Sequence, residues 1–253
     1  MGAMRDIEAY QRAYAASDFE PVQARMRRRM LLDLLARWKP ARVLEVGCGN
    51  AALFADCPTF ERFCVVEPGP AFAEMARAQA ADDPRIRVVE AFMEDAAAQL
   101  VGESFDCILL SGLLHEVPDA ARLLAAVRLL CSATTQVHVN VPNARSLHRL
   151  LALEMGLIDD LHQLSANQRD LQQPRTFDID SLSALATDSG FEVLEHGSYF
   201  VKPFTHRQMA QLQDNGLLDE RMLDGLYGLA RHLPDMGSEI FVHLRRAASA
   251  REA

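Results

Sequence analysis

The chain has 253 residues, of which 49% are hydrophobic and 24% charged, and 26 basic against 35 acidic residues leave a formal net charge of −9. A composition this close to the globular average excludes a disordered chain, a collagen-like repeat and a disulfide scaffold. The acidic balance argues against a dedicated nucleic-acid-binding protein, which needs a basic footprint. The length permits one elaborated domain or two small ones, and composition does not choose between them.

The cysteine pattern and the first residues favour an intracellular protein. The five cysteines are odd in number, contain no C-x-x-C pair and lie in part within apolar runs, which is typical of reduced, buried thiols. Residues 1–10 lack the apolar stretch of a secretory signal, and no apolar run approaches the ~20 residues that cross a bilayer. We therefore expect a cytoplasmic protein without membrane contact.

Hydrophobic periodicity predicts helices first and then alternating strands and helices. Helical spacing over 6–15 and 20–38 predicts an N-terminal extension that Pro40 ends. Alternation of strands with helices further along the chain predicts βαβ units and a parallel sheet buried on both faces. The predicted strands are 42–47, 63–67, 86–90, 105–111 and 137–141, with helical segments at about 51–57, 70–81, 92–100 and 119–131.

The second part of the chain is less regular. A helix is predicted over 145–154 and another over 180–189, and the long segment 157–177 between them is typical of a lid or binding segment. Since no repeat or linker divides the chain, we expect one domain over 1–253. Its parts are a helical cap (1–40), a cofactor-binding half (42–145), substrate-side helices with a lid (146–235, including helical material around 206–231 and a sixth strand over 191–201) and a last strand (237–246).

A strand that runs into a glycine turn is the sharpest feature of the sequence. An apolar strand leads to Gly47 and Gly49, so that bare backbone can approach a ligand at the carboxyl end of the strand. Twenty residues after Gly47, Glu67 ends the next strand, where a carboxylate can accept hydrogen bonds from ribose hydroxyls. With Ala52 as a third small residue, the pattern also satisfies a dinucleotide fingerprint, so NAD is not excluded. Glu45, inside the apolar strand, needs a partner, which a cationic or amine-bearing ligand beside Gly47 would provide.

Five segments together carry a family resemblance: LEVGCGNA (44–51), VVEPG (65–69), FDCILLSGLLHEVPD (105–119), VHVNVPN (137–143) and GSEIFVHLRR (237–246). They resemble the class I S-adenosylmethionine-dependent methyltransferases over about 42–246. The resemblance implies an α/β, Rossmann-like, doubly wound sheet of seven mostly parallel strands. Its last strand is antiparallel and lies between the fifth and the sixth. Ala51 stands where the family's glycine pattern has its third glycine, which is a departure.

The resemblance also implies S-adenosyl-L-methionine as cofactor. Gly47 and Gly49 would face its amino-acid part, Glu67 its ribose and Phe92–Glu94 its adenine. The family has an aspartate after the third strand, and Glu90, Glu94 and Asp95 all compete for that position here. The implied cofactor-binding set is Glu45, Gly47, Cys48, Gly49, Glu67, Pro68, Phe92, Met93, Glu94, Ser111 (near the methionyl moiety) and Gly112.

Two polar residues at strand ends are catalytic candidates. His115 follows the fourth strand, in the crevice where open α/β sheets bind ligands, and can act as general base if the acceptor must lose a proton. The alternative for His115 is helix capping or packing beneath the cofactor, and a structural role is expected for Glu116. Asn140 lies at the end of a buried strand, where an amide without a partner is costly.

Five further residues are expected on the substrate side. Tyr10 and Tyr14 share one face of the first helix and either close the pocket over a sulfonium or pack in the core. Asn143 and His148 follow the fifth strand, where Asn143 also suits helix capping. Tyr199 lies near the end of the sixth strand.

The remaining charged residues are given plainer roles. The arginines at 25–29 are interpreted as a solvated helix face rather than an anion site. Lys202 is expected at the mouth of the same site as Tyr199. His162 and His206 have no metal-ligand spacing, so no metal is predicted.

The leading hypothesis is a methyltransferase that acts on a small-molecule metabolite by in-line methyl transfer. A second hypothesis is cyclisation within the cofactor, in which its amine attacks the γ-carbon and gives azetidine-2-carboxylate with release of methylthioadenosine. A non-catalytic cofactor-binding scaffold and an NAD dehydrogenase stay open as alternatives. The expected partner is a small molecule, with neither nucleic acid nor membrane, and the sequence is compatible with a homodimer. It does not identify the acceptor atom.

Overall fold

A computed structural model of the chain describes residues 19–57, 59–164, 168–169 and 173–248. The predicted first helix, with Tyr10 and Tyr14, lies outside the described residues. All five cysteines are described, and each is buried and free of a disulfide. None of the described helices combines the length and the apolar character needed to cross a membrane.

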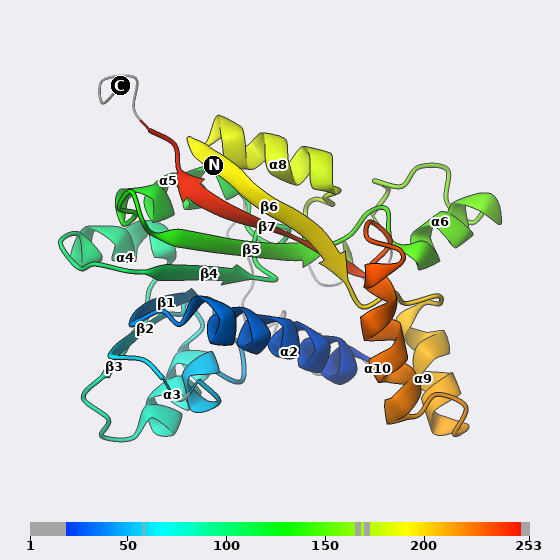
Figure 1. Cartoon of the computed structure of the whole chain (residues 1–253), viewed down its shortest axis with the longest axis horizontal. Helices are drawn as coiled ribbons and strands as arrows, with labels where there is room; N and C mark the ends of the chain where they lie inside the picture. Colours follow the sequence, from blue (N-terminus) through cyan, green and yellow to red (C-terminus); the bar gives the residue numbers. More distant parts are fainter. Residues whose placement is uncertain (1–18, 58, 165–167, 170–172, 249–253) are drawn as a thin grey trace.

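The sheet has seven strands in the order β3-β2-β1-β4-β5-β7-β6 (Figure 1). The first five strands pair in parallel, whereas β7 is antiparallel to both β5 and β6. The last strand therefore inserts between the fifth and the sixth, which confirms the predicted fold class. The strands are β1 (Arg42–Val46), β2 (Arg62–Val66), β3 (Ile86–Val89), β4 (Cys107–Ser111), β5 (Gln136–Pro142), β6 (Phe191–Tyr199) and β7 (Glu239–Arg246).

The helices fall near their predicted places, with one exception. After β1 the structure has only a 3₁₀ turn, Leu53–Ala55, where a helix over 51–57 was predicted. The prediction is wrong because Pro58 follows within one turn and disfavours α geometry in the residue before it. The helices are α2 (Glu20–Trp38), α3 (Pro70–Ala80), α4 (Met93–Leu100), α5 (Ala120–Leu129), α6 (Leu147–Glu154), α8 (Ile179–Asp188), α9 (His206–Asp214) and α10 (Glu220–Gly228), followed by a 3₁₀ turn at Leu229–Arg231.

Helices cover both faces of the sheet, and successive strand residues alternate between two apolar cores. In β4, Ile108 and Leu110 pack with α4, α5 and α8, whereas Cys107 and Leu109 pack on the opposite side with α2, α9 and α10. Burial of each such aliphatic side chain contributes about 1.5–3 kcal/mol. Burial on both faces explains why these strands are almost continuously apolar.

The carboxyl ends of β1, β4, β5 and β6 point toward the same edge of the sheet, and α6, α9 and α10 lie beyond that edge (Figure 1). In an open α/β sheet this edge is where ligands bind. The fold thus brings loops after β1, β2 and β4 together with helices from the second half of the chain.

Candidate active site

A cavity of about 1280 Å³ opens at the carboxyl edge of the sheet. Every member of the cofactor-binding set expected from the sequence lines it, and so do the candidates His115, Asn143 and His148. Asn140 and Tyr199 do not line it. The cofactor-side lining consists of Glu45, Gly47, Cys48, Gly49, Glu67, Pro68, Phe92, Met93, Glu94, Ser111 and Gly112.

The turn after β1 needs glycine for its backbone conformation. Gly47 has a φ of +76° and Gly49 a φ of +56°, in the left-handed region that side chains with a Cβ rarely adopt. The Gly47 N–H donates to the Val66 carbonyl at 2.8 Å, which fixes the turn against β2. At Gly47 and Gly49 the turn therefore presents main chain to the cavity.

Glu67 fastens this glycine turn from the end of β2. Its Oε2 accepts hydrogen bonds from the Cys48 N–H at 3.0 Å and the Gly49 N–H at 3.4 Å, and its Oε1 accepts from the Gly69 N–H at 2.8 Å. Burial raises the pKa of the Glu67 carboxyl, and these backbone donors oppose that rise. The carboxylate thus lies at the cavity surface in a fixed orientation.

Glu45 is a buried carboxyl group that accepts a single hydrogen bond from the described residues. Its side chain is 4% exposed, and Oε2 accepts one hydrogen bond, from the Leu53 N–H at 3.0 Å. Burial raises the pKa of Glu45 to about 8. Arg28 lowers that pKa through its field, but its guanidinium is bound to Asp56 at 2.6 Å and to the Ala51 carbonyl at 2.8 Å. The cavity side of Glu45 therefore offers a place for a cationic ligand group.

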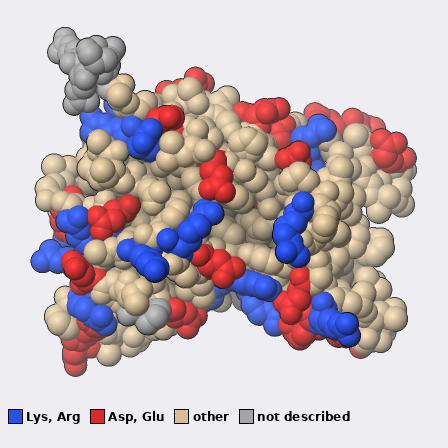
Figure 2. All heavy atoms as spheres, in the orientation of Figure 1, with Lys and Arg blue, Asp and Glu red and all other residues tan. Residues whose placement is uncertain are grey.

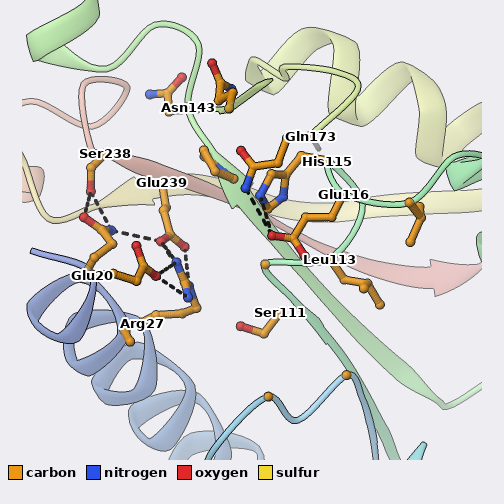
Figure 3. Close-up of a pocket in the computed structure, with 18 of the residues that line it drawn as sticks. Glu20, Arg27, Ser111, Leu113, His115, Glu116, Asn143, Gln173, Ser238 and Glu239 are labelled. Carbon is orange, nitrogen blue, oxygen red and sulfur yellow. Dashed lines mark hydrogen bonds and ion pairs between the residues drawn. The ribbon is translucent and has the colours of Figure 1, made fainter. Parts of the chain in front are cut away.

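Arg27 and Glu239 form an ion pair on another side of the cavity, in which the side chain of Glu239 is 2% exposed and that of Arg27 is 18% exposed (Figure 3). The Arg27 Nε lies 3.0 Å from both Glu239 oxygens, and Nη2 lies 2.5 Å from Oε1. Glu20 approaches the same guanidinium at 3.4 Å. The interpretation of the arginines at 25–29 as a solvated face is wrong at Arg27. The side chain of Arg27 points from α2 toward β7, where it pairs with the carboxylate of Glu239.

The same carboxylate explains where Asn140 and Tyr199 point. The Asn140 Nδ2 donates to Glu239 Oε2 at 2.8 Å, the Tyr199 hydroxyl donates to the same oxygen, and His138 lies 3.1 Å from Asn140 Oδ1. Asn140 is fully buried and Tyr199 is 4% exposed. The partner that the buried amide requires is thus Glu239 rather than a ligand, so we do not carry Asn140 forward as a catalytic candidate or Tyr199 as a substrate-binding one.

Sequence reasoning missed Glu239 itself. The signal was present, since a glutamate opens the apolar strand of the closing segment, in the same way as Glu45 lies in β1. An acidic residue in a buried strand predicts a charged or hydrogen-bonded partner. Arg27, which provides it, is 212 positions away along the chain.

His115 and Glu116 lie on the opposite side of the cavity from Arg27 and Glu239, with Ser111 between the two groups in the view of Figure 3. The His115 Nε2 is 3.5 Å from Glu116 Oε1, which also accepts from Gln173 Nε2 at 3.2 Å. His115 is 4% exposed and lines the cavity. This position suits proton transfer to or from a bound ligand.

Asn143 and His148 both line the cavity but differ in how they are engaged. The Asn143 Nδ2 donates to the carbonyls of Asp235 and Gly237, each at 2.9 Å, and its Oδ1 accepts from the Arg145 N–H at 2.8 Å. Asn143 thus holds two loops together. His148, in contrast, has a buried Nδ1 with no hydrogen-bond partner among the described residues.

The candidate metal ligands of the described residues are their His, Cys, Asp and Glu side chains. Within 19–57, 59–164, 168–169 and 173–248, no three His, Cys, Asp or Glu side chains are grouped so that they could hold a metal ion.

Comparisons with known proteins agree with this architecture. The model of a family described as "Methyltransferase domain" matches residues 20–196. No curated protein matches the chain.

Three similar solved structures have TM-scores of 0.54 to 0.57. One is a methyltransferase from Thermotoga maritima described as a possible histamine N-methyltransferase (TM-score 0.57, 18% identity, covering 94% of this chain and 99% of that one). The second is the plantazolicin methyltransferase BamL, solved with a desmethyl plantazolicin analogue and S-adenosylhomocysteine (0.57, 14%, covering 96% and 95%). The third is the [4+2]-cyclase SpnF (0.54, 15%, covering 87% and 81%).

The family match extends over more than half of the chain. The chain therefore belongs to the class I S-adenosylmethionine-dependent methyltransferases.

Proposed function

We propose that the protein transfers the methyl group of S-adenosylmethionine to a small-molecule metabolite by in-line displacement. The observation that carries the proposal is that one cavity is bordered both by the glycine turn with Glu45 and Glu67 and by the opposed pairs Arg27–Glu239 and His115–Glu116. Cofactor and acceptor can therefore occupy the same enclosed space. Because the sulfonium supplies both the methyl group and its leaving group, the protein has to bind and align two ligands.

The residues are assigned by the chemistry of the cofactor that each could meet. Glu45 would pair with the ammonium group beside Gly47 and Gly49, Glu67 would accept from ribose hydroxyls, and Phe92–Glu94 would border the adenine. The under-partnered carboxyl of Glu45 supports the first assignment, since an ammonium ion replaces the missing partner.

On the acceptor side, His115 is the proposed general base. It faces the cavity with Glu116 within 3.5 Å of its Nε2, and a carboxylate near an imidazole stabilises the imidazolium that forms when a proton is taken up. His115 would remove the proton of the acceptor as the methyl group is transferred.

The charge distribution supports a small acceptor. On the face shown in Figure 2, the described acidic and basic side chains alternate, without the continuous basic band that a nucleic acid requires. The net charge of −9 points the same way.

The test is to identify the co-product. Purified protein is incubated with S-adenosylmethionine, with and without a metabolite extract, and the products are analysed by mass spectrometry. We expect S-adenosylhomocysteine, formed only with extract. Methylthioadenosine without extract would overturn the proposal and favour cyclisation of the cofactor.

Binding of S-adenosylhomocysteine should release close to one proton near pH 7. With a pKa of about 8, Glu45 is mostly protonated in the free protein, and a bound ammonium group favours the carboxylate. Since binding releases a proton, affinity should rise with pH from 6 to 8. Calorimetry in buffers of different ionisation enthalpy measures the release. The proton release should vanish in Glu45→Gln and persist in Glu61→Gln, which alters an exposed carboxylate. A proton release that persists in Glu45→Gln would contradict the pairing of Glu45 with the ammonium group of the cofactor.

His115→Gln should lower turnover by about 100-fold while leaving the affinity for S-adenosylhomocysteine unchanged, because a general base acts only in the chemical step. The matched control is His196→Gln, an exposed histidine on β6, which should keep full activity. In the wild type, kcat should fall on the acidic side of a pH profile, and this limb should disappear in His115→Gln. An unchanged profile would show that His115 only packs beneath the ligands.

A further inference from the structure

Lys202, just beyond β6, is a buried amine at the cavity surface. Lys202 is only 2% exposed, and it lines the cavity. Among the residues that the structure describes, none forms a hydrogen bond or an ion pair with its Nζ. The negative charges of Glu20 and Glu239 act on Lys202, and both carboxylates are already bound to Arg27.

Two histidines share this end of the cavity. His148 on α6 and His206 at the start of α9 both line it, and each has its pKa lowered by burial and then by the charge of Lys202. The buried Nδ1 of His148 lacks a partner within the described part of the chain. The first turn of α9, with Arg207, also borders this space, and the positive end of a helix dipole favours a negative charge there.

The two ends of the cavity differ in their charged side chains. Glu45, Glu67 and Glu94 border the end proposed for the cationic cofactor. At the end reached from β6, Lys202, His148, His206 and Arg207 border the cavity, and the carboxylates there, Glu20 and Glu239, are paired with Arg27. In the sheet order β1-β4-β5-β7-β6, three strands separate β1 from β6, so the basic group is on the far side from the glycine turn. Burial lowers the pKa of Lys202 to about 7, which shows how poorly the protein alone compensates its charge.

Resting on the proposed function, we propose that Lys202, His148 and His206 bind an anionic group, a carboxylate or a phosphate, of the methyl acceptor. The acceptor class is then an acidic metabolite that would extend from the Ser111 side of the cavity, where the methionyl part of the cofactor would lie, to this subsite. An anion here would give the buried amine of Lys202 an opposite charge and would give His148 Nδ1, which has no hydrogen-bond partner among the described residues, a group to bind.

The chain contains only two lysines, which makes a direct test feasible. Lysine labelled with ¹³C at Cε gives two NMR signals, from Lys202 and from the exposed Lys39, and Lys39→Arg assigns them. The protein, saturated with S-adenosylhomocysteine, is titrated with acetate, with inorganic phosphate and with acetamide at constant ionic strength. We expect a saturable shift of Lys202 with acetate or phosphate, a rise of its titration midpoint by about one pH unit, and no effect of acetamide. The stronger of the two anions identifies the acidic group.

Three outcomes would overturn the subsite: no saturable shift, an equal shift of Lys39, or a full shift produced by S-adenosylhomocysteine alone, which would place Lys202 at the cofactor's own carboxylate. Lys202→Met and His148→Gln should each weaken binding of the preferred anion about 10-fold or more in a calorimetric assay. The wild-type titration stands even if a variant does not fold. These readouts measure binding and need no turnover, whereas methyl transfer is tested by identifying the co-product. The two experiments therefore distinguish an error in the proposed anion subsite from an error in the proposed function.

Discussion

Arg27→Met is expected to destabilise the protein by about 3–5 kcal/mol, because it removes one partner of a buried ion pair and leaves the other behind. Glu239 is 1% exposed, and Arg27 meets it through both Nε and Nη2. Methionine keeps much of the aliphatic stem, so the loss is one of charge and hydrogen bonds rather than of packing. At roughly 2–4 °C per kcal/mol for a chain of this size, thermal unfolding should shift down by about 6 °C or more.

The control for this prediction lies on the same helix. Arg25 pairs with Glu220, but the two side chains are 49% and 68% exposed, so Arg25→Met should cost no more than about 1 kcal/mol. Equal melting temperatures for Arg25→Met and Arg27→Met would contradict the assignment of Arg27 to a buried pair.

The pH dependence gives a second check on Arg27→Met. Arg27 and the neighbouring donors hold the pKa of Glu239 at about 2, below its ordinary value of 4.5. In the wild type this group therefore contributes stability above pH 4.5, which is lost as the pH falls toward 2. Without Arg27 burial dominates, the pKa of Glu239 rises above 4.5, and its contribution is lost as the pH rises instead. The difference in unfolding free energy between the two proteins should be largest near pH 7 and shrink below pH 4.5.

The cofactor half of the site could be predicted from the sequence because its signals are local. Gly47 and Gly49 are required by a turn of a few residues, and Glu67 directly follows β2, the next strand along the chain. The register of β1 and β2 then brings the carboxylate to the turn. Each step depends on neighbours in the sequence, which is why the expected residues and the observed lining coincide.

The second half of the site depends on contacts between distant segments. Asn140 was singled out correctly as a buried amide that needs a partner, but the sequence did not reveal that the partner is Glu239, 99 positions away. Likewise, helical spacing placed Arg27 on α2 without showing which face of that helix turns toward β7. Periodicity identifies the buried face of a helix, but it does not identify the polar side chain of another element that packs against that face.

The network around Glu239 has a consequence for the cavity. Ser238 and Glu239 line it, and both are held by Gln23, whose Nε2 donates to Ser238 Oγ at 3.0 Å and to Glu239 Oε1 at 2.9 Å. The start of β7 is thus tied to α2 on the acceptor side. Any change that moves the start of β7 should alter the cavity as well as stability.

Gly237→Ala should produce such a change. A Cβ at Gly237 would lie on the backbone N and O of Tyr199 and 2.7 Å from Ser198 Oγ, so β6 or β7 must shift. Gly237 is also fixed by hydrogen bonds, since its N–H donates to Ser198 Oγ at 2.9 Å and its carbonyl accepts from Asn143. Overpacking against backbone should cost about 3 kcal/mol, or roughly 6–12 °C in melting temperature, and the affinity for acceptor should fall because Ser238 and Glu239 move.

Gly225→Ala is the matched control, because the same methyl group is added where nothing lies within 4 Å. Gly225 is inside α10, where alanine is favoured over glycine by about 0.5–1 kcal/mol, so this variant should melt at or above the wild-type temperature. If Gly237→Ala and Gly225→Ala had the same melting temperature, the segment before β7 could move aside without loss of unfolding free energy. The close packing of β7 against Tyr199 would then not be what fixes Glu239 beside the cavity.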